Sequence, residues 1–165
     1  SKHIPWDVEN FTQNDDGSRI AFVSNEDGIS VLHVLDTADY RELRLPALPI
    51  GVVGGIEFSP DGGRLALSIN TATSPTDVYV VDIAGNQMTR WTQSEVGGLD
   101  TSKFVTPTLV RFKSFDGRSI PAFYYRPAGL KPGEKVPVLI WLFFYWRMCS
   151  PLKTAPDKDF ILIYN

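Results

Sequence analysis

The sequence predicts a mainly β protein, in which two four-stranded blades of a partial β-propeller precede the first strands of an α/β domain. Two observations support this prediction. A short phrase with an Asp-Gly turn occurs twice, 45 residues apart, within residues 1–105. Farther along, the run Val138–Leu142 is apolar at every position, which is typical of a strand covered on both faces of a parallel or mixed sheet.

The repeated phrase is Asp16–Phe22, and it matches Asp61–Leu67. Each copy starts with the Asp-Gly turn and continues as an Arg-apolar-Ala-apolar strand. Each unit also has a short apolar strand before the turn, a third strand that ends in Asp, and a weaker fourth strand. Four short strands in about 45 residues are typical of a propeller blade. The residues that we expect to pack between neighbouring blades are Ile20, Phe22, Leu65 and Leu67.

The fourth strands of the two units are predicted at Arg41–Leu45 and Gln87–Trp91. A β-sandwich of short strands is the alternative, although a sandwich does not require one phrase at a fixed period. Two blades cannot close a propeller, since closed propellers have about four to eight. We therefore expect either a fragment of a longer protein or a chain with exposed sheet faces and edges, which favour self-association.

A second β-rich region lies at residues 108–126, where alternating residues from Leu109 to Ser114 precede the tight turn Asp116-Gly117. The run Ile120–Arg126 completes a predicted hairpin, and Pro127 ends the pairing because it lacks an amide donor. A polar stretch at 92–107 is predicted to be a surface linker. The expected division is 1–105 (blades and linker), 106–142 (strands of the second domain) and 143–165 (an unmatched tail).

Composition and charge narrow the classes of partner. With 43% hydrophobic residues the chain can form a core, and a net charge of −3 provides no basic surface for nucleic acid. The longest apolar run, 136–146, contains Pro137 and is too short to span a bilayer as a helix, so no membrane association is expected. The single Cys149 excludes an internal disulfide; it favours a cytoplasmic location without fixing the compartment.

No catalytic residue can be assigned from the sequence. A nucleophile elbow needs Gly-x-Ser-x-Gly. Ser30 and Ser119 each lie two residues after a glycine, but Leu32 and Pro121 stand where the second glycine is needed. Both serines are therefore interpreted as strand or turn residues.

The two histidines are His3 and His33. We interpret His33 as an amphipathic strand residue, because its counterpart in the second unit is Tyr79 and a histidine base needs a nucleophile and a carboxylate beside it. The segment Asn14–Gly17 begins like a calcium loop but lacks the closing glutamate, so a turn is expected. The sequence contains no phosphate loop, dinucleotide fingerprint or zinc-type cluster. No cofactor-binding or metal-binding residue is assigned, and no cofactor is expected.

The phrases Phe58–Gly62 and Val110–Pro127, followed by Val136–Leu142, resemble the prolyl oligopeptidase family of serine peptidases. The resemblance covers about residues 6–142. It implies an α/β-hydrolase domain capped by a propeller, a Ser-His-Asp triad, peptide substrates, and no metal or organic cofactor.

The resemblance ends at Leu142. The family continues with His-Gly-Gly-Pro, which helps to shape the oxyanion site, whereas this chain has Phe143–Trp146. Bulky aromatic residues cannot replace glycines where the backbone must approach a substrate. A frameshift or truncation of a longer gene would produce this change. We therefore expect a fragment of a serine peptidase that hydrolyses peptide or acyl-peptide bonds. The fragment itself is expected to be inactive, because the triad is absent. The alternative is a non-enzymatic β-propeller module that binds a protein or peptide partner.

Overall fold

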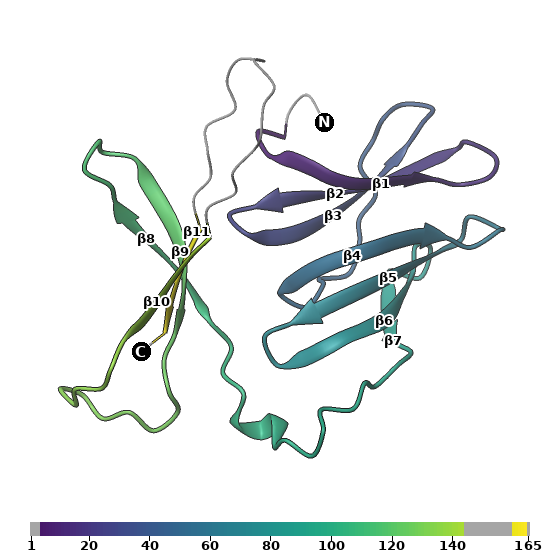
Figure 1. The fold of residues 1–165 in the computed structure, drawn as a ribbon. Helices are drawn as coiled ribbons and strands as arrows, with labels where there is room; N and C mark the ends of the chain where they lie inside the picture. The colour runs from purple at the N-terminus through teal and green to yellow at the C-terminus, as the bar shows by residue number, and fades with distance from the viewer. Residues whose placement is uncertain (1–3, 144–159, 165) are drawn as a thin grey trace. The chain divides into compact units, whose positions relative to one another are not determined.

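The computed structural model describes residues 4–143 and 160–164, with side chains described for residues 4–140. The fold is mainly β, and its one helical element in this part of the chain is the 3₁₀ turn Thr101–Lys103 (Figure 1). None of the described residues form a helix long and apolar enough to cross a membrane. The chain divides into two compact units, Ser1–Ser102 and Lys103–Asn165, which we describe separately.

The first sheet of the first unit is an antiparallel meander of three strands. They are β1 (Asp7–Gln13), β2 (Arg19–Glu26) and β3 (Ile29–Asp36), in that order. The turn between β1 and β2 is closed by the Asp-Gly pair. Gly17 has a φ of +72°, and the amide of Ser18 donates to Oδ1 of Asp16 at 2.8 Å. The interpretation of Asn14–Gly17 as a turn is therefore confirmed.

The second sheet has four antiparallel strands in sequence order. They are β4 (Gly51–Phe58), β5 (Arg64–Thr71), β6 (Ser74–Asp82) and β7 (Gln87–Arg90). Its Asp-Gly turn has the same geometry as the first, since Gly62 has a φ of +66° and the amide of Gly63 donates to Oδ1 of Asp61 at 3.0 Å. The predicted strand at Gln87–Trp91 is confirmed, one residue shorter.

The repeat seen in the sequence is also present in the hydrogen bonds. The amide of Asn14 donates to the carbonyl of Arg19 at 3.1 Å, and the amide of Ser59 donates to that of Arg64 at 2.9 Å, 45 residues later. Each arginine in turn pairs across its ladder with the aspartate that ends the third strand. The two copies of the repeat therefore share backbone geometry as well as sequence.

The prediction of a fourth strand in the first repeat, at Arg41–Leu45, is wrong. The chain pairs with β3 only through the isolated bridge between Leu35 and Glu42, where the amide of Leu43 donates to the carbonyl of Val34 at 2.8 Å. Two prolines, at 46 and 49, follow this bridge and have no amide hydrogen to donate to a ladder. The pairing therefore stops, and the first sheet has three strands.

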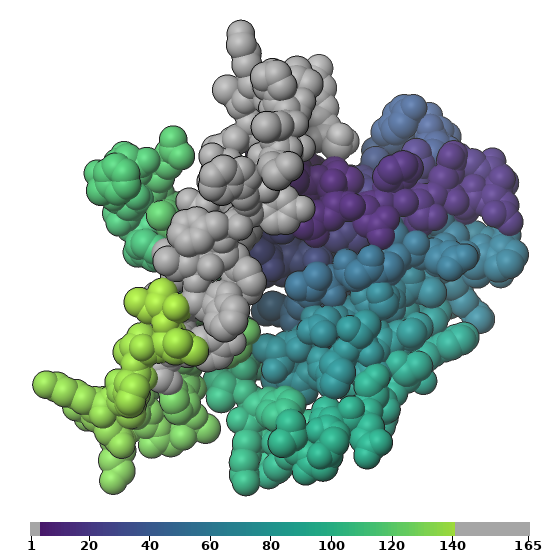
Figure 2. Space-filling view, in the orientation of Figure 1, coloured from purple at the N-terminus to yellow at the C-terminus, as the bar shows by residue number. Residues whose placement is uncertain are grey.

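The core of the first unit lies between the two sheets, which rest directly against each other in the space-filling view (Figure 2, purple and teal). The first sheet contributes Ala21, Val23, Leu32 and Val34, and the second contributes Val53, Leu65, Leu67, Ile69, Tyr79, Val81 and Ile83. The expected inward packing of Leu65 and Leu67 is thus confirmed. Burial of these aliphatic side chains is the main stabilising contribution of the unit.

The expected packing of Ile20 and Phe22 between neighbouring blades stays a prediction, because neither residue belongs to the core that the two sheets share. Alternation along β2 places them on the face opposite Ala21, where the ring of Phe22 stacks on His33 with 4.8 Å between the ring centroids. Ile20 corresponds to Leu65 in the repeat, yet only Leu65 faces the shared core. The two sheets therefore meet through non-equivalent faces.

The second unit contains one mixed sheet, in the order β10-β11-β9-β8. Its strands are β8 (Thr108–Lys113), β9 (Ser119–Tyr125), β10 (Leu139–Phe143) and β11 (Phe160–Tyr164). The predicted hairpin is confirmed, since β8 and β9 pair antiparallel around a turn in which Gly117 has a φ of +85°. Strand β11 runs parallel to β9 and antiparallel to β10.

The apolar run after the hairpin does form a strand, but the expected cover on both faces is not found. Val138, Leu139 and Ile140 are 54%, 58% and 59% exposed. In a parallel or mixed α/β sheet, helices would cover such a strand, and no α-helix occurs in the described part of the chain. These three side chains are therefore more than half exposed.

Candidate functional site

A chain of three polar side chains lies on the face of the first sheet that points away from the shared core. Oγ of Ser24, on β2, is 2.9 Å from Nε2 of His33 on β3. Nδ1 of His33 is 2.6 Å from Oε1 of Glu42, the residue that forms the isolated bridge to β3. The order serine, histidine, carboxylate is that of a hydrolytic triad.

These partners of His33 were not identified from the sequence. The signal was present in the hairpin closed by Asp27-Gly28, because the pairing of Phe22 with His33 puts every second residue of both strands on one face. Ser24 therefore shares the face of His33. The position of Glu42 beside His33 depends on the path of the chain after β3. The prolines that follow change this path from the predicted strand.

The geometry does not make Ser24 a nucleophile. Its side chain is completely buried, and its hydroxyl donates to Oε1 of Glu26 at 3.0 Å, which leaves Oγ as the acceptor for His33. A nucleophile must reach the carbonyl carbon of a substrate. The chain of hydrogen bonds instead ties β2, β3 and the residue Glu42 together.

The other candidate residues from the sequence belong to strands of the fold or lie outside the described residues. Oγ of Ser30 is buried and accepts a hydrogen bond from the amide of Val53 at 3.0 Å, which links the two sheets of the unit. Ser119 begins β9 and is exposed. His3 and residues 144–146 lie outside the described residues. No three His, Cys, Asp or Glu side chains among those described are grouped so that they could hold a metal ion.

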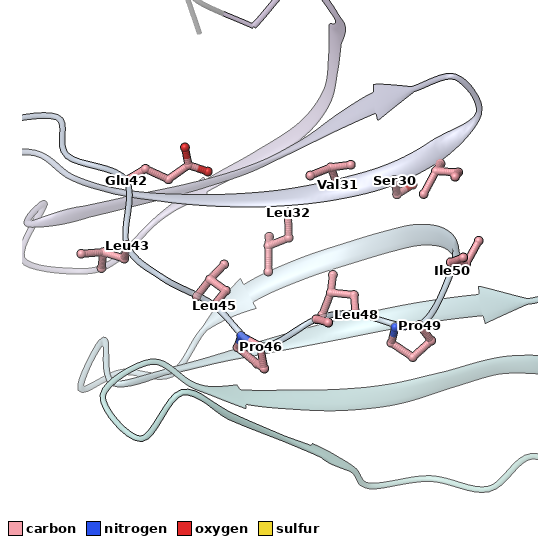
Figure 3. Close-up of a pocket in the computed structure, with 12 residues that line it drawn as sticks. Ser30, Val31, Leu32, Glu42, Leu43, Leu45, Pro46, Leu48, Pro49 and Ile50 are labelled. Atoms are coloured by element: carbon pink, nitrogen blue, oxygen red, sulfur yellow. The ribbon is translucent and has the colours of Figure 1, made fainter.

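A cavity of about 350 Å³ lies beside Glu42, between β3 and the segment that follows it (Figure 3). Leu32 from β3 and Leu45 and Leu48 from the segment point toward one another across it. Of its twelve lining residues ten are apolar, one is Ser30, and Glu42 is the only one with an ionisable side chain. The cavity can therefore hold an aliphatic group, and the carboxylate of Glu42 lies at one end of the cavity.

A second polar cluster surrounds Asp77 on β6, whose side chain is fully buried. It accepts hydrogen bonds from Oγ of Ser74 at 2.9 Å, Oγ1 of Thr92 at 2.8 Å and the amide of Ser94 at 2.8 Å, and it is ion-paired with Arg90. Burial alone would raise the pKa of Asp77, but the hydrogen bonds from Thr92, Ser74, Arg90 and Ser94 together lower the pKa far below its usual value. All four of these partners of the carboxylate belong to the first unit, so the cluster stabilises the fold and anchors the start of the linker.

Comparison with known proteins gives a match in the fold only. No protein-family model matches the sequence, and no curated protein matches it by sequence. Among solved structures, a prolyl endopeptidase matches with a TM-score of 0.58 and 22% identity, over 72% of this chain and 17% of that protein. The chain has the fold of part of a prolyl oligopeptidase.

Two further structures agree with this finding. Prolyl oligopeptidase B from Galerina marginata matches with a TM-score of 0.58 and 15% identity, over 71% of this chain and 17% of that protein. Puromycin hydrolase matches with a TM-score of 0.60 and 20% identity, over 79% of this chain and 20% of that protein. The resemblance to prolyl oligopeptidases seen in the sequence is therefore confirmed at the level of the fold, and the chain spans a fifth or less of the length of these proteins.

Proposed function

We propose that the chain is part of a serine peptidase of the prolyl oligopeptidase family, to which it contributes two propeller blades and the first strands of the hydrolase domain. The observation that carries the proposal is the match of 72% of the chain to one part of a prolyl endopeptidase. The whole protein would hydrolyse peptide or acyl-peptide bonds, with short peptides as substrates and without a metal or organic cofactor.

The packing of the first unit supports the assignment to propeller blades. Blades stack in tandem, so that one face of each blade meets the opposite face of the next. The two sheets here meet in this manner, since the face with Ala21 in the first contacts the face with Leu65 in the second. A symmetric sandwich would instead bring equivalent positions together. The parallel pairing of β9 with β11 supports the second assignment, because α/β-hydrolase sheets are mixed.

The chain by itself is proposed to be inactive. The one described serine with a histidine and a carboxylate in line is Ser24, and its burial keeps substrate away. A triad formed by the whole protein would therefore use residues other than Ser24, His33 and Glu42.

A fluorophosphonate probe tests this part of the proposal, since it labels activated serines in folded hydrolases. We expect no specific labelling of the folded chain and no cleavage of a short peptide substrate. Labelling that disappears in Ser24→Ala but persists in Ser119→Ala would contradict the proposal, because it would make Ser24 reactive.

The coding region tests the relation to a longer protein. We expect further repeats of about 45 residues upstream and, in one of the reading frames downstream, a Gly-x-Ser-x-Gly elbow. A continuous reading frame that lacks both would contradict the proposal.

A further inference from the structure

No described strand pairs with the outer edge of β3 next to the cavity. The carbonyl of Val34 accepts from the amide of Leu43, and the amide of Asp36 donates to the carbonyl of Arg41, so the main-chain groups of these even-numbered residues point away from β2. In an antiparallel ladder this direction alternates along the strand. Ser30 and Leu32 therefore direct their amides and carbonyls to the same edge, where no described strand pairs with them.

The chain's own continuation does not fill this edge. After the bridge at Glu42 the segment turns under β3, with Pro46 and Pro49 in the lining of the cavity (Figure 3). Neither proline can donate to a ladder. The cavity of about 350 Å³ thus lies beside a row of main-chain donors and acceptors.

The edge also lacks three features that commonly protect sheet edges. Exposed edge strands commonly carry lysine, proline or a bulge. The run Ile29–Leu35 has none of these residues, and the register between β2 and β3 is unbroken, whereas β1 has a shift between Val8 and Asn10. An uncharged, regular edge of this kind can accept another strand.

We propose that this edge binds an extended segment of a partner protein by strand addition, with an aliphatic side chain in the cavity and a lysine or arginine at Glu42. The side chain of Glu42 is 56% exposed, and His33 contacts its Oε1, so that Oε2 can receive a cation. The hydrogen bonds from Ser24 through His33 hold this carboxylate in place. This inference does not depend on the proposed function.

The two faces of the sheet define the order of residues in the segment. The side chain of Glu42 meets His33 on one face of β3, whereas Leu32 lines the cavity from the other face. Neighbouring residues of a strand point to opposite faces, so the basic and the aliphatic residue must be adjacent. In an antiparallel orientation the basic residue precedes the aliphatic one, because the segment would enter at the Glu42 end.

The blocked peptide acetyl-Thr-Lys-Leu-Thr-Val-Thr-amide is a suitable probe. It is titrated into the full isotope-labelled chain while amide hydrogen exchange is followed by NMR. We expect the exchange of the Ser30 and Leu32 amides to slow at least roughly tenfold at saturation, because both become hydrogen-bonded. Shifts should be confined to residues 29–34 and 42–50.

A pair of methylated peptides provides the matched control. N-methylation of the leucine and valine removes the donors that face β3 and should weaken binding by roughly tenfold or more. The control peptide is N-methylated at two threonines, the one after the leucine and the one after the valine. The amides of these threonines point away from β3, so their methylation should leave binding nearly unchanged. Equal effects of the two modifications would overturn the proposal.

A charge exchange tests the role of Glu42. Glu42→Lys should weaken the lysine peptide and strengthen a peptide with glutamate in place of lysine, and Glu42→Gln, which keeps an acceptor for His33, should give an intermediate effect. Glu95→Lys makes the same change in net charge at an exposed site and should have little effect. The proposal is overturned by the absence of binding, or by protection of Ser30 and Leu32 that rises with chain concentration without peptide, since a second copy would then occupy the edge.

Discussion

Arg19 donates a hydrogen bond from Nη1 to the main-chain carbonyl of Gly62, with 2.7 Å between the two atoms. The contact joins β2 of the first sheet to the Asp-Gly turn of the second. Both residues belong to copies of the same phrase, so the repeat supplies both an element of the fold and the contact between its copies. The turn at Gly62 is therefore a sensitive point of the first unit.

Substitution Gly62→Ala should lower the free energy of unfolding by about 1–3 kcal/mol. The φ of +66° is strained for alanine, and its Cβ would lie 2.7 Å from Nδ2 of Asn14. Urea unfolding of the chain measures the loss. Gly63→Ala is the matched control, because its Cβ would meet nothing closer than 3.5 Å. A loss as large for Gly63→Ala as for Gly62→Ala would refute this explanation.

The buried carboxylate of Asp77 should make the first unit sensitive to acid. Its pKa in the folded chain is below the usual 3.8, so its stabilising effect is complete above that pH and is lost as the pH falls toward the lower folded value. We expect the urea midpoint to fall as the pH drops below about 3.8. Asp77→Asn should remove part of this pH dependence.

At neutral pH the same substitution should lower the urea midpoint clearly, since Arg90 loses its buried partner and the amide nitrogen of asparagine cannot accept a hydrogen bond. The comparison is Asp39→Asn, at an exposed ion pair with Arg41, which should change the midpoint little. An unchanged acid profile in Asp77→Asn would show that other carboxylates control the acid response.

The hydrogen bonds of His33 should matter for stability rather than for chemistry. Ser24→Ala removes the buried partner of Nε2 and should cost about 1–3 kcal/mol of unfolding free energy. Ser119→Ala, at an exposed position, should change this free energy by less than about 0.5 kcal/mol. Thermal and urea unfolding of the two variants provide the comparison; similar values would mean that the buried hydrogen bonds contribute nothing net.

Local patterns predicted most of the strands, because each depends on a few neighbouring residues. The turns at Asp16-Gly17 and Asp116-Gly117 follow from the preference of glycine for positive φ, and the structure has both. The strand expected at Arg41–Leu45 failed because the prolines that follow outweigh the β propensity of two leucines.

The site was less accessible from the sequence, because it depends on which faces meet. The facing of Ile20 and Phe22 is decided by the partner sheet, and no pattern within β2 shows which side that partner takes. The contact between His33 and Glu42 depends on a two-residue bridge after a turn at Tyr40, whose φ is +56°. Such a contact is a tertiary feature with no period in the sequence.

The exposed apolar strand of the second unit should cause self-association. Leu139 and Ile140 are both more than half exposed on consecutive positions, so the strand presents an apolar side chain on each face. Substitution of both by lysine should shift the chain toward the monomer in sedimentation velocity, because buried charges would oppose contact between copies. Ile50→Lys, which replaces a residue of the first unit that is 56% exposed, is the control and should leave the distribution unchanged. If Ile50→Lys alone produced the monomer, association would occur through the first unit, next to the cavity, and the apolar strand would need another explanation.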